Sequence, residues 1–190
     1  MNLGYIISTI IASLILLSLV GLNSRIMRSS GEQTLYTMAK IQSDMVLDYV
    51  KDDMRSMGYR IETTNPITLA DENRIRFLVH FENRVDTTSI EWHFAETPVG
   101  SGRNPNVRPL YRIENGGDEI AIGSGIVDFR LVYLNSARDT LTAPVSNPGE
   151  IRHIGLEVIT ESLDSYDANR FERSTWSGVI TPFNLRPPTN

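Results

Sequence analysis

Two of the three histidines, together with a nearby glutamate, have side chains of the type that bind metal ions. His80 and His93 fall in successive stretches of alternating polar and apolar residues, which predict two neighbouring strands. With Glu91 they could form a zinc site, because imidazole nitrogens and carboxylate oxygens are zinc ligands. Like His153, they are also ordinary residues for the exposed face of a strand, and we favour that interpretation.

A second group of candidate metal ligands is rich in oxygen. Asp164, Asp167 and Asn169 have a spacing that could hold calcium, which prefers oxygen ligands. The segment lacks the central glycine and the terminal bidentate glutamate of a complete calcium loop. A solvated turn is therefore the favoured interpretation, and the three residues are weak metal candidates.

Two glycine–serine–glycine segments are weak signals for nucleophile or phosphate chemistry. Gly123-Ser124-Gly125 lacks the glycine two residues after the serine that a nucleophile elbow needs. Gly100-Ser101-Gly102 is not followed by a helix with a lysine, as a phosphate loop is. The chain has no cysteine, which excludes disulfides, thiolate metal sites and a cysteine nucleophile. We predict no enzyme, no metal and no cofactor.

The charges of the chain are unevenly distributed. The 190 residues have a net charge of -5, with no cluster of Lys and Arg of the kind that nucleic-acid binding requires. Residues 1–24 have no charged side chain, and the first is Arg25. The chain therefore combines an apolar N-terminal segment with a polar, acidic body, and we predict no nucleic-acid partner.

The apolar run at residues 5–22 is long enough for a membrane. A helix over the uncharged stretch measures roughly 36 Å, more than the hydrocarbon core of a bilayer. A signal peptide would have a basic start, which Met1-Asn2-Leu3 does not provide. A membrane anchor and a helix that packs into a polymer both fit. Small residues four positions apart would allow close helix packing, as in the pairs Ser8–Ala12 and Thr9–Ser13.

The helical pattern continues beyond this run. Apolar residues recur at three- and four-residue steps as one amphipathic stripe, and Gly58 is suited to end the helix. We predict one helix from about residue 3 to residue 57, weakened at Gly21, a candidate point of unwinding, and at 29–31. The stripe consists of Leu35, Met38, Ile41, Met45 and Tyr49, and of Val46, Val50, Met54 and Met57.

The pattern changes to an alternation of two after residue 59, with Asn, Asp, Gly and Pro between the runs. We expect an α+β fold in which a mainly antiparallel sheet packs on the second half of the helix. The expected units are an apolar membrane or assembly helix at 1–24, its amphipathic continuation at 25–57, and a β-rich head at 58–190. The predicted strands are 74–81, 89–94, 109–114, 118–122, 128–133, 151–160 and 174–181.

This combination resembles the type IV pilin and type II secretion pseudopilin superfamily. The segment DDMRSMGY at 52–59 is similar to the aspartate-x-arginine-x-x-glycine-tyrosine ending of the helix in W-type minor pilins. The order of the strand segments from 72 to 160 resembles that of the W-type group and of the J-type pseudopilins. The resemblance covers most of the chain and implies a pilin-like fold.

The resemblance also implies a processing site and a location. Gly4-Tyr5 is similar to the junction at which pilin precursors are cleaved, and Thr9 then occupies the position where pilins have a glutamate. The implied route is insertion in the inner membrane, contact with the pilus assembly machinery, and export into an extracellular, cell-surface filament.

Three functions remain open at this stage. The first is a structural subunit of a helical homopolymer, and the second is a minor pilin or pseudopilin that primes or caps a filament. The third is a single-pass anchored extracytoplasmic binding domain. The assembly core that we predict for the first consists of Tyr5, Ile6, Ile7, Ile10, Ile11, Leu14, Ile15, Leu17 and Leu22.

Overall fold

The computed structural model describes residues 3–63, 65–82, 84–98, 103–166 and 170–185. One long helix is followed by two antiparallel sheets and a short 3-10 turn, η1, at Pro148–Glu150. The first sheet has the order β1-β2-β3-β4-β5, and the second has the order β7-β6-β8-β9. The elements are α1 (Leu3–Ser56), β1 (Ile67–Ala70), β2 (Arg74–Val79), β3 (Thr88–Phe94), β4 (Leu110–Glu114), β5 (Glu119–Ala121), β6 (Ile126–Leu134), β7 (Thr140–Leu141), β8 (His153–Glu161) and β9 (Arg173–Ile180).

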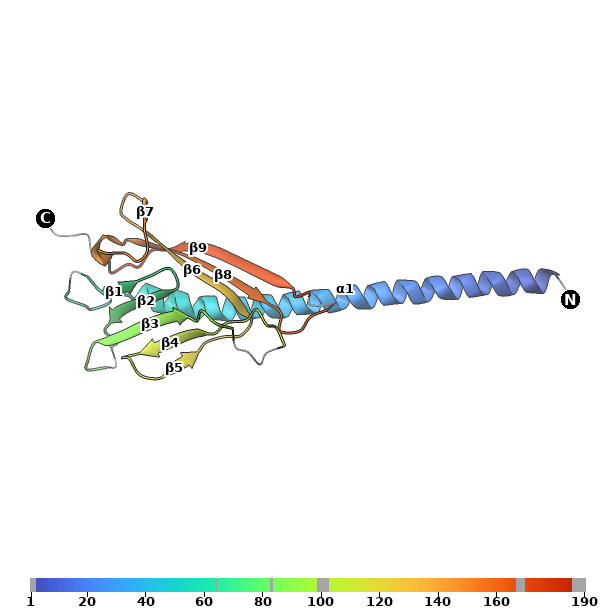
Figure 1. The fold of residues 1–190 in the computed structure, drawn as a ribbon, viewed down its shortest axis with the longest axis horizontal. Helices are drawn as coiled ribbons and strands as arrows, with labels where there is room; N and C mark the ends of the chain where they lie inside the picture. The colour runs from blue at the N-terminus through green and yellow to red at the C-terminus, as the bar shows by residue number, and fades with distance from the viewer. Residues whose placement is uncertain (1–2, 64, 83, 99–102, 167–169, 186–190) are drawn as a thin grey trace.

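The helix α1 is continuous over 54 residues, which corresponds to a length of roughly 80 Å. No proline interrupts it, because the first proline is Pro66. It ends where Gly58 adopts a positive φ of 74° and donates its N–H to the carbonyl of Leu78 at 2.9 Å. Figure 1 shows the first half of α1 projecting from the head, while the second half runs between the two sheets.

The two sheets meet around the second half of α1 and enclose one core. Its largest fully buried side chains include Trp92, Phe77 and Phe129 from the strands and Leu47 and Met54 from the helix. Alternation along β2 and β8 places every second side chain in this core. The predicted α+β architecture, a long N-terminal helix with antiparallel strands packed on its second half, is therefore confirmed.

The sheet that we expected is divided in two at the Gly123–Gly125 segment. Gly123 and Gly125 both have φ of 75°, and the chain crosses here from β5 to β6. A Cβ on Gly123 would lie 2.2 Å from Cγ2 of Val46 in α1, and one on Gly125 would lie 2.5 Å from the carbonyl oxygen of Glu161. The segment is thus a close crossing next to the helix, as a glycine at positive φ permits.

The predicted apolar stripe of α1 is divided between two environments, because the head covers only part of it. Val46, Val50, Met54 and Met57 are fully buried in the head. The rest of the stripe, in contrast, lies on a side of the helix that the two sheets leave largely exposed. Its exposed fractions are Met38 54%, Ile41 54%, Met45 68% and Tyr49 54%.

Candidate assembly surface on the N-terminal helix

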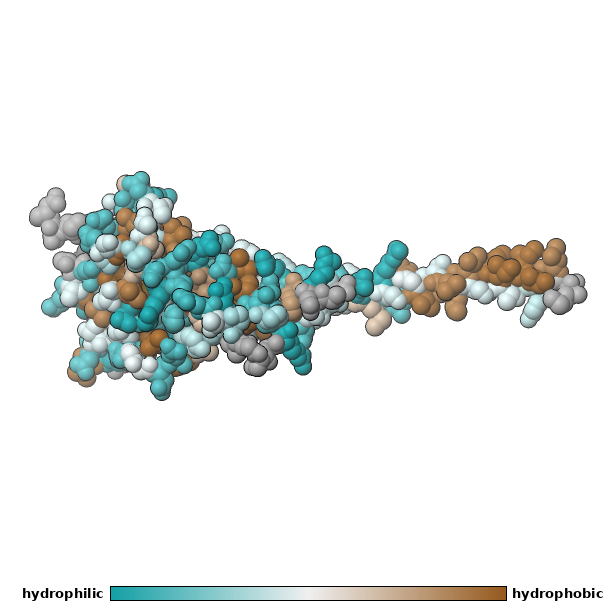
Figure 2. All heavy atoms as spheres, in the orientation of Figure 1, coloured by the Kyte–Doolittle hydropathy of each residue, from teal (hydrophilic) through white to brown (hydrophobic). Residues whose placement is uncertain are grey.

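The projecting half of α1 is an apolar surface with no intramolecular cover. Every described residue from Leu3 to Gly31 is exposed. The helix is long and apolar enough near its N-terminus to cross a membrane. In Figure 2 apolar residues predominate toward the free end of α1, whereas hydrophilic residues dominate the visible face of the head. We call residues 3–22 of this surface the apolar rod.

All nine predicted assembly residues lie on the apolar rod. Their exposed fractions run from 39% for Ile6 to 78% for Tyr5. Gly4 and Gly21 lie within the unbroken helix, and a Cβ on either would meet nothing within 4 Å. The structure leaves the roles predicted for Gly4-Tyr5 in processing and for Gly21 in unwinding as predictions. The nine residues are Tyr5, Ile6, Ile7, Ile10, Ile11, Leu14, Ile15, Leu17 and Leu22.

Three hydroxyl groups of the apolar rod, those of Thr9, Ser13 and Ser18, form hydrogen bonds within the helix itself. Thr9 donates to the carbonyl of Tyr5 at 2.8 Å, and Ser13 donates to that of Thr9 at 2.8 Å. Ser18 donates to the carbonyl of Leu14 at 2.9 Å. A hydroxyl bonded in this way needs no partner from lipid or protein, so the rod can enter an apolar environment without an unsatisfied donor at these positions.

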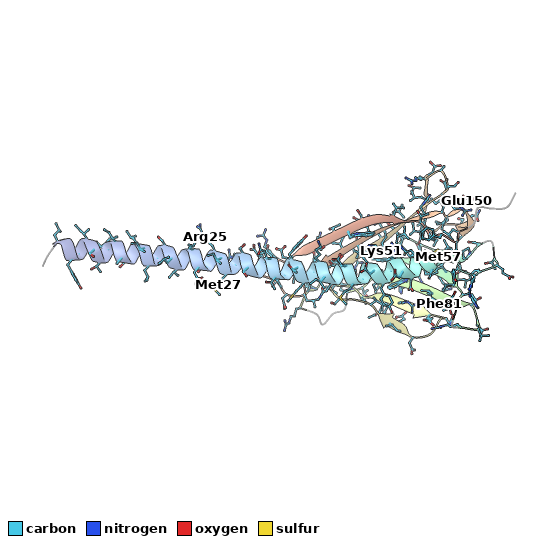
Figure 3. All side chains as sticks on the ribbon, turned by 180° about the vertical axis from the view of Figure 1, so that it is seen from behind. Arg25, Met27, Lys51, Met57, Phe81 and Glu150 are labelled. Atoms are coloured by element: carbon cyan, nitrogen blue, oxygen red, sulfur yellow. The ribbon has the colours of Figure 1, made fainter. Side chains whose placement is uncertain are left out.

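The exposed apolar stripe extends the rod along the head. Met27, Met38 and Met45 follow one another at about three and two helical turns, so they share one face of α1. Ile41 and Tyr49 lie on the same side. Figure 3 shows Arg25 and Met27 on the bare helix, and Lys51 and Met57 where the head surrounds it. We call Met38, Ile41, Met45 and Tyr49 the head stripe.

A buried ion pair fixes α1 to the first sheet. The carboxylate of Asp53 accepts hydrogen bonds from Nε1 of Trp92 at 3.0 Å and from Nε of Arg112 at 2.7 Å. The side chains of Asp53 and Arg112 are only 11% and 13% exposed. Arg112 also bonds Glu114 at 3.2 Å. Burial alone would raise the pKa of Glu114, but its hydrogen bonds with Arg84 and Arg112 hold that pKa below its usual value.

The DDMRSMGY segment forms the junction between α1 and the head. Asp53 provides the ion pair, and Gly58 provides the helix end. A Cβ on Gly58 would lie 3.1 Å from Pro66 and 3.2 Å from the carbonyl oxygen of Asn184. Tyr59 donates its hydroxyl to Glu82 at 3.0 Å. The segment that is similar to W-type minor pilins thus has a structural role here.

The structure does not bring His80 and His93 together, as the possible zinc site with Glu91 would require. In the β2–β3 pairing His93 lies opposite Arg74, whereas Val79, which precedes His80, lies opposite Thr88 at the other end. Adjacent strands bring together only residues in register, so the two imidazoles are at opposite ends of the pair. Among the described residues, no group of three or more His, Cys, Asp or Glu side chains could hold a metal ion.

The other residues of the metal predictions have protein partners or lie outside the described residues. Glu91 is almost fully buried and pairs with Arg74 and with Arg76, the latter at 2.6 Å. His153 forms a hydrogen bond with Thr181 through Nδ1 at 2.8 Å. Asp164 accepts a hydrogen bond from Arg103 at 2.7 Å. Asp167, Asn169 and the segment Gly100-Ser101-Gly102 lie outside the described residues.

A polar cluster at the start of β9 was not predicted from the sequence. Glu161 accepts hydrogen bonds from Arg173 at 2.6 Å and from the amides of Asn104 and Asn106 at 3.1 and 3.0 Å. Although burial raises the pKa of Glu161, these hydrogen bonds, led by that of Arg173, lower it below its usual value.

The role of Asp53 was not predicted either, although the sequence contains a signal for it. Asp53 follows Val46 and Val50 on the buried side of the helix.

One pair of clefts in the head is shallow and rich in charged side chains. Two adjoining clefts of about 520 and 410 Å³ share Glu96, Arg108 and Asp128. Arg108 packs over the ring of Phe94 at 4.4 Å and donates to the carbonyl of Val127 at 2.7 Å. These contacts give Arg108 a structural role, and the described residues that line these two clefts present no arrangement of a nucleophile and a base.

No family model, no curated protein and no solved structure matches this chain. What the structure itself gives is a long apolar N-terminal helix joined to antiparallel sheets, compatible with a pilin-like fold and with membrane anchoring.

Proposed function

We propose that this protein is a structural subunit of a pilin-like cell-surface filament, which polymerises through a bundle of its N-terminal helices. The observation that carries the proposal is that one continuous helix exposes apolar residues along both halves, first on the rod and then on the head stripe. In the membrane before assembly, lipid covers the rod. In the filament, the rods and head stripes of neighbouring copies cover one another.

The head stripe favours a polymer over a single-pass anchor. The hydrocarbon core of a bilayer is about 30 Å thick and needs about 20 apolar helical residues. Met38 follows Leu22 at roughly 24 Å along the helix axis, so a membrane that covers the rod does not reach it. Lipid therefore cannot cover the head stripe, whereas the helix of a neighbouring copy can.

The energetics agree with assembly by the rod. Burial of a Leu or Ile side chain that was exposed to water contributes about 1.5–3 kcal/mol. When the rod leaves the lipid, protein must therefore take the place of the lipid around it. Exposure to water would cost this free energy at each apolar position of the rod. Within lipid, close packing drives helix association, and the small residues Ser8, Ala12, Thr9 and Ser13 permit it.

Substitutions in the rod test the proposal. Ile11→Asp and Leu14→Asp each place a carboxylate in the predicted bundle, where a charge without a partner costs several kcal/mol. We expect loss of filaments in negative-stain images of material sheared from cells that produce the protein. Val85→Asp, at a head position that is 94% exposed, is the matched control and should leave filament yield unchanged. Normal filament yield from both rod variants would refute the proposal.

The second candidate, a minor pilin that primes or caps a filament of another protein, is favoured by one observation. The first acidic residue of the chain is Glu32, so the rod has no carboxylate, and Thr9 stands where pilins have a glutamate. Immunogold labelling separates the candidates. Label along whole filaments supports the principal subunit, and label at one tip supports the minor pilin. A detergent monomer with no filaments would support the single-pass anchored domain instead.

A further inference from the structure

The two sheets end in strand edges that lie on opposite sides of α1. β5 is the last strand of the first sheet and β9 is the last strand of the second. Figure 1 shows β9 along one side of the helix and β5 on the other. Among the described residues, neither outer edge takes part in a backbone hydrogen bond to another element. A free strand edge is a template for pairing with another chain.

The two edges have opposite directions and lie at the same level of the head. Thr160, which pairs with Ser174 at the start of β9, bonds the carbonyl of Ala39, and Asn184, after its end, bonds that of Met57. β9 therefore runs in the direction of α1. Ile120 in β5 lies opposite Arg112, the partner of Asp53, whereas the later Gly123 approaches Val46, so β5 runs the other way.

The surface beside β9 is apolar and basic. A pocket of about 430 Å³ lies between α1 and β9. Lys51 lies 4.1 Å from the centre of the Trp176 ring, and Arg55 lines the same pocket. Two large apolar residues of this surface are exposed, Val179 at 64% and Phe183 at 88%. The β9 edge therefore has a groove that could accept an apolar side chain from a partner. The basic residues beside the groove favour a partner that also has an acidic side chain next to the apolar one.

The β5 edge has an exposed apolar side chain with acidic residues beside it. Ile120 is 56% exposed and lies on the face of the sheet that is directed toward α1, since its partner Arg112 bonds Asp53 of that helix. Asp118 directly precedes β5, and a continued alternation would place it on the same face as Ile120. Asp118 and Glu119 are exposed, and neither forms an ion pair among the described residues.

We propose that the β5 edge of one copy pairs antiparallel with the β9 edge of the next copy, so that the two sheets continue from head to head. The inference rests on the proposed filament, because parallel α1 helices in one bundle give β5 and β9 of neighbours opposite directions. Ile120 then enters the groove beside Trp176, and Asp118 approaches Lys51. The inner faces of both sheets remain directed toward the bundle.

The contact is heterologous, since it joins two different surfaces of the same chain. Such contacts generate open helical polymers rather than closed dimers. A pairing of three residues is small, but neighbours already held by their rods meet it at a high effective concentration. The edge contact therefore sets which heads are neighbours, while the rods provide the cohesion.

Cysteine cross-linking in the full-length protein tests the pairing, and the absence of native cysteines keeps the readout free of background. Glu119→Cys is combined in one chain with Thr175→Cys, Ser177→Cys or Val179→Cys, which are exposed positions on β9 and sample three registers. Facing strand residues have Cβ atoms about 4.5–5.5 Å apart, close to disulfide geometry. Glu119→Cys with Thr140→Cys, an exposed position on the edge strand β7, is the matched control.

The result expected is a ladder of covalent multimers on non-reducing gels in at least one register, at about tenfold or more above the control pair. Filaments at normal yield without such a ladder overturn the edge pairing and leave the proposed function intact. A ladder from membrane extracts of cells without filaments supports the pairing and refutes the filament. If neither a ladder nor filaments are observed, both the edge pairing and the proposed function are overturned.

A charge exchange tests the groove separately in the register that cross-links. Lys51→Glu and Asp118→Lys each bring like charges together and should lower the cross-linked fraction about fivefold or more. The double variant restores an opposite-charge pair and should recover cross-linking to within about twofold. Unchanged cross-linking in both single variants would overturn the contact between Asp118 and Lys51.

Discussion

The Asp53 ion pair should make the largest single contribution of any polar side chain of α1 to head stability. Asp53→Ala removes the carboxylate while Arg112 stays buried beside it and Trp92 keeps its N–H. Leaving one partner of a buried pair without its counter-charge costs about 3–5 kcal/mol. Because a whole domain is stable by only about 5–15 kcal/mol, this loss is a large share of the total.

The assay is urea unfolding of the full-length protein in detergent, followed by the fluorescence of its two tryptophans. Trp92 is a direct reporter, because its ring lies in the core and its N–H bonds Asp53. Asp52→Ala is the matched control one residue away. Its carboxylate is 80% exposed and pairs with Arg55 at 3.7 Å, so we expect a change below about 0.5 kcal/mol.

Two further variants separate the charge from the hydrogen bond. Asp53→Asn keeps an acceptor for Trp92 and should cost less than Asp53→Ala. Arg112→Leu in the Asp53→Ala background removes the unpaired charge and should recover part of the stability, since a buried pair can be exchanged for apolar groups at little cost. If Asp53→Ala and Asp52→Ala have the same unfolding midpoint with an unchanged slope, the reasoning about the buried pair is refuted.

Two more predictions concern pH and the sheet crossing. The folded-state pKa of Glu161 lies below its usual value, so its stabilisation is full above the unfolded-state pKa of about 4.3 and is lost as the pH falls through the folded-state pKa. The difference in urea midpoint between the native protein and Glu161→Gln should therefore be large at pH 7 and shrink on acidification below pH 4; a difference independent of pH would contradict it. Gly123→Ala should destabilise the head by more than about 2 kcal/mol, because the new Cβ would overlap Val46 and φ is positive. Gly116→Ala has a similar φ in open space and should cost about 1 kcal/mol, and equal unfolding midpoints for the two variants would refute this reading of the crossing.

The fold could be predicted where local patterns determine it. The helix ends at Ser56, one residue before the predicted end, because a helical period without proline and a glycine at the end are local signals. All seven predicted strands are present. β1 and β7 were missed because four and two residues are too short for an alternation to stand out.

The pairing of the strands and the cover of the helix could not be predicted in the same way. Periodicity tells which residues share a face, but it does not tell which strand lies next to which or in which register. For this reason the sequence left open whether His80 and His93 approach each other, and the division into two sheets was not foreseen. The same limit applies to Met45 and Val46, which both belong to the predicted stripe, although the head covers only Val46.

The position of α1 between the two sheets determines how the protein responds to pulling. Tension on a filament of such subunits would enter each head along the axis of α1, parallel to the surfaces that hold the helix. The contacts from Ala39, whose carbonyl bonds Thr160, to Asp53, which bonds Trp92 and Arg112, would then be loaded together in shear. Contacts that break together resist more force than contacts that peel apart in sequence. In such a filament, a head without disulfides would obtain its mechanical resistance from the length of its contact with a single helix.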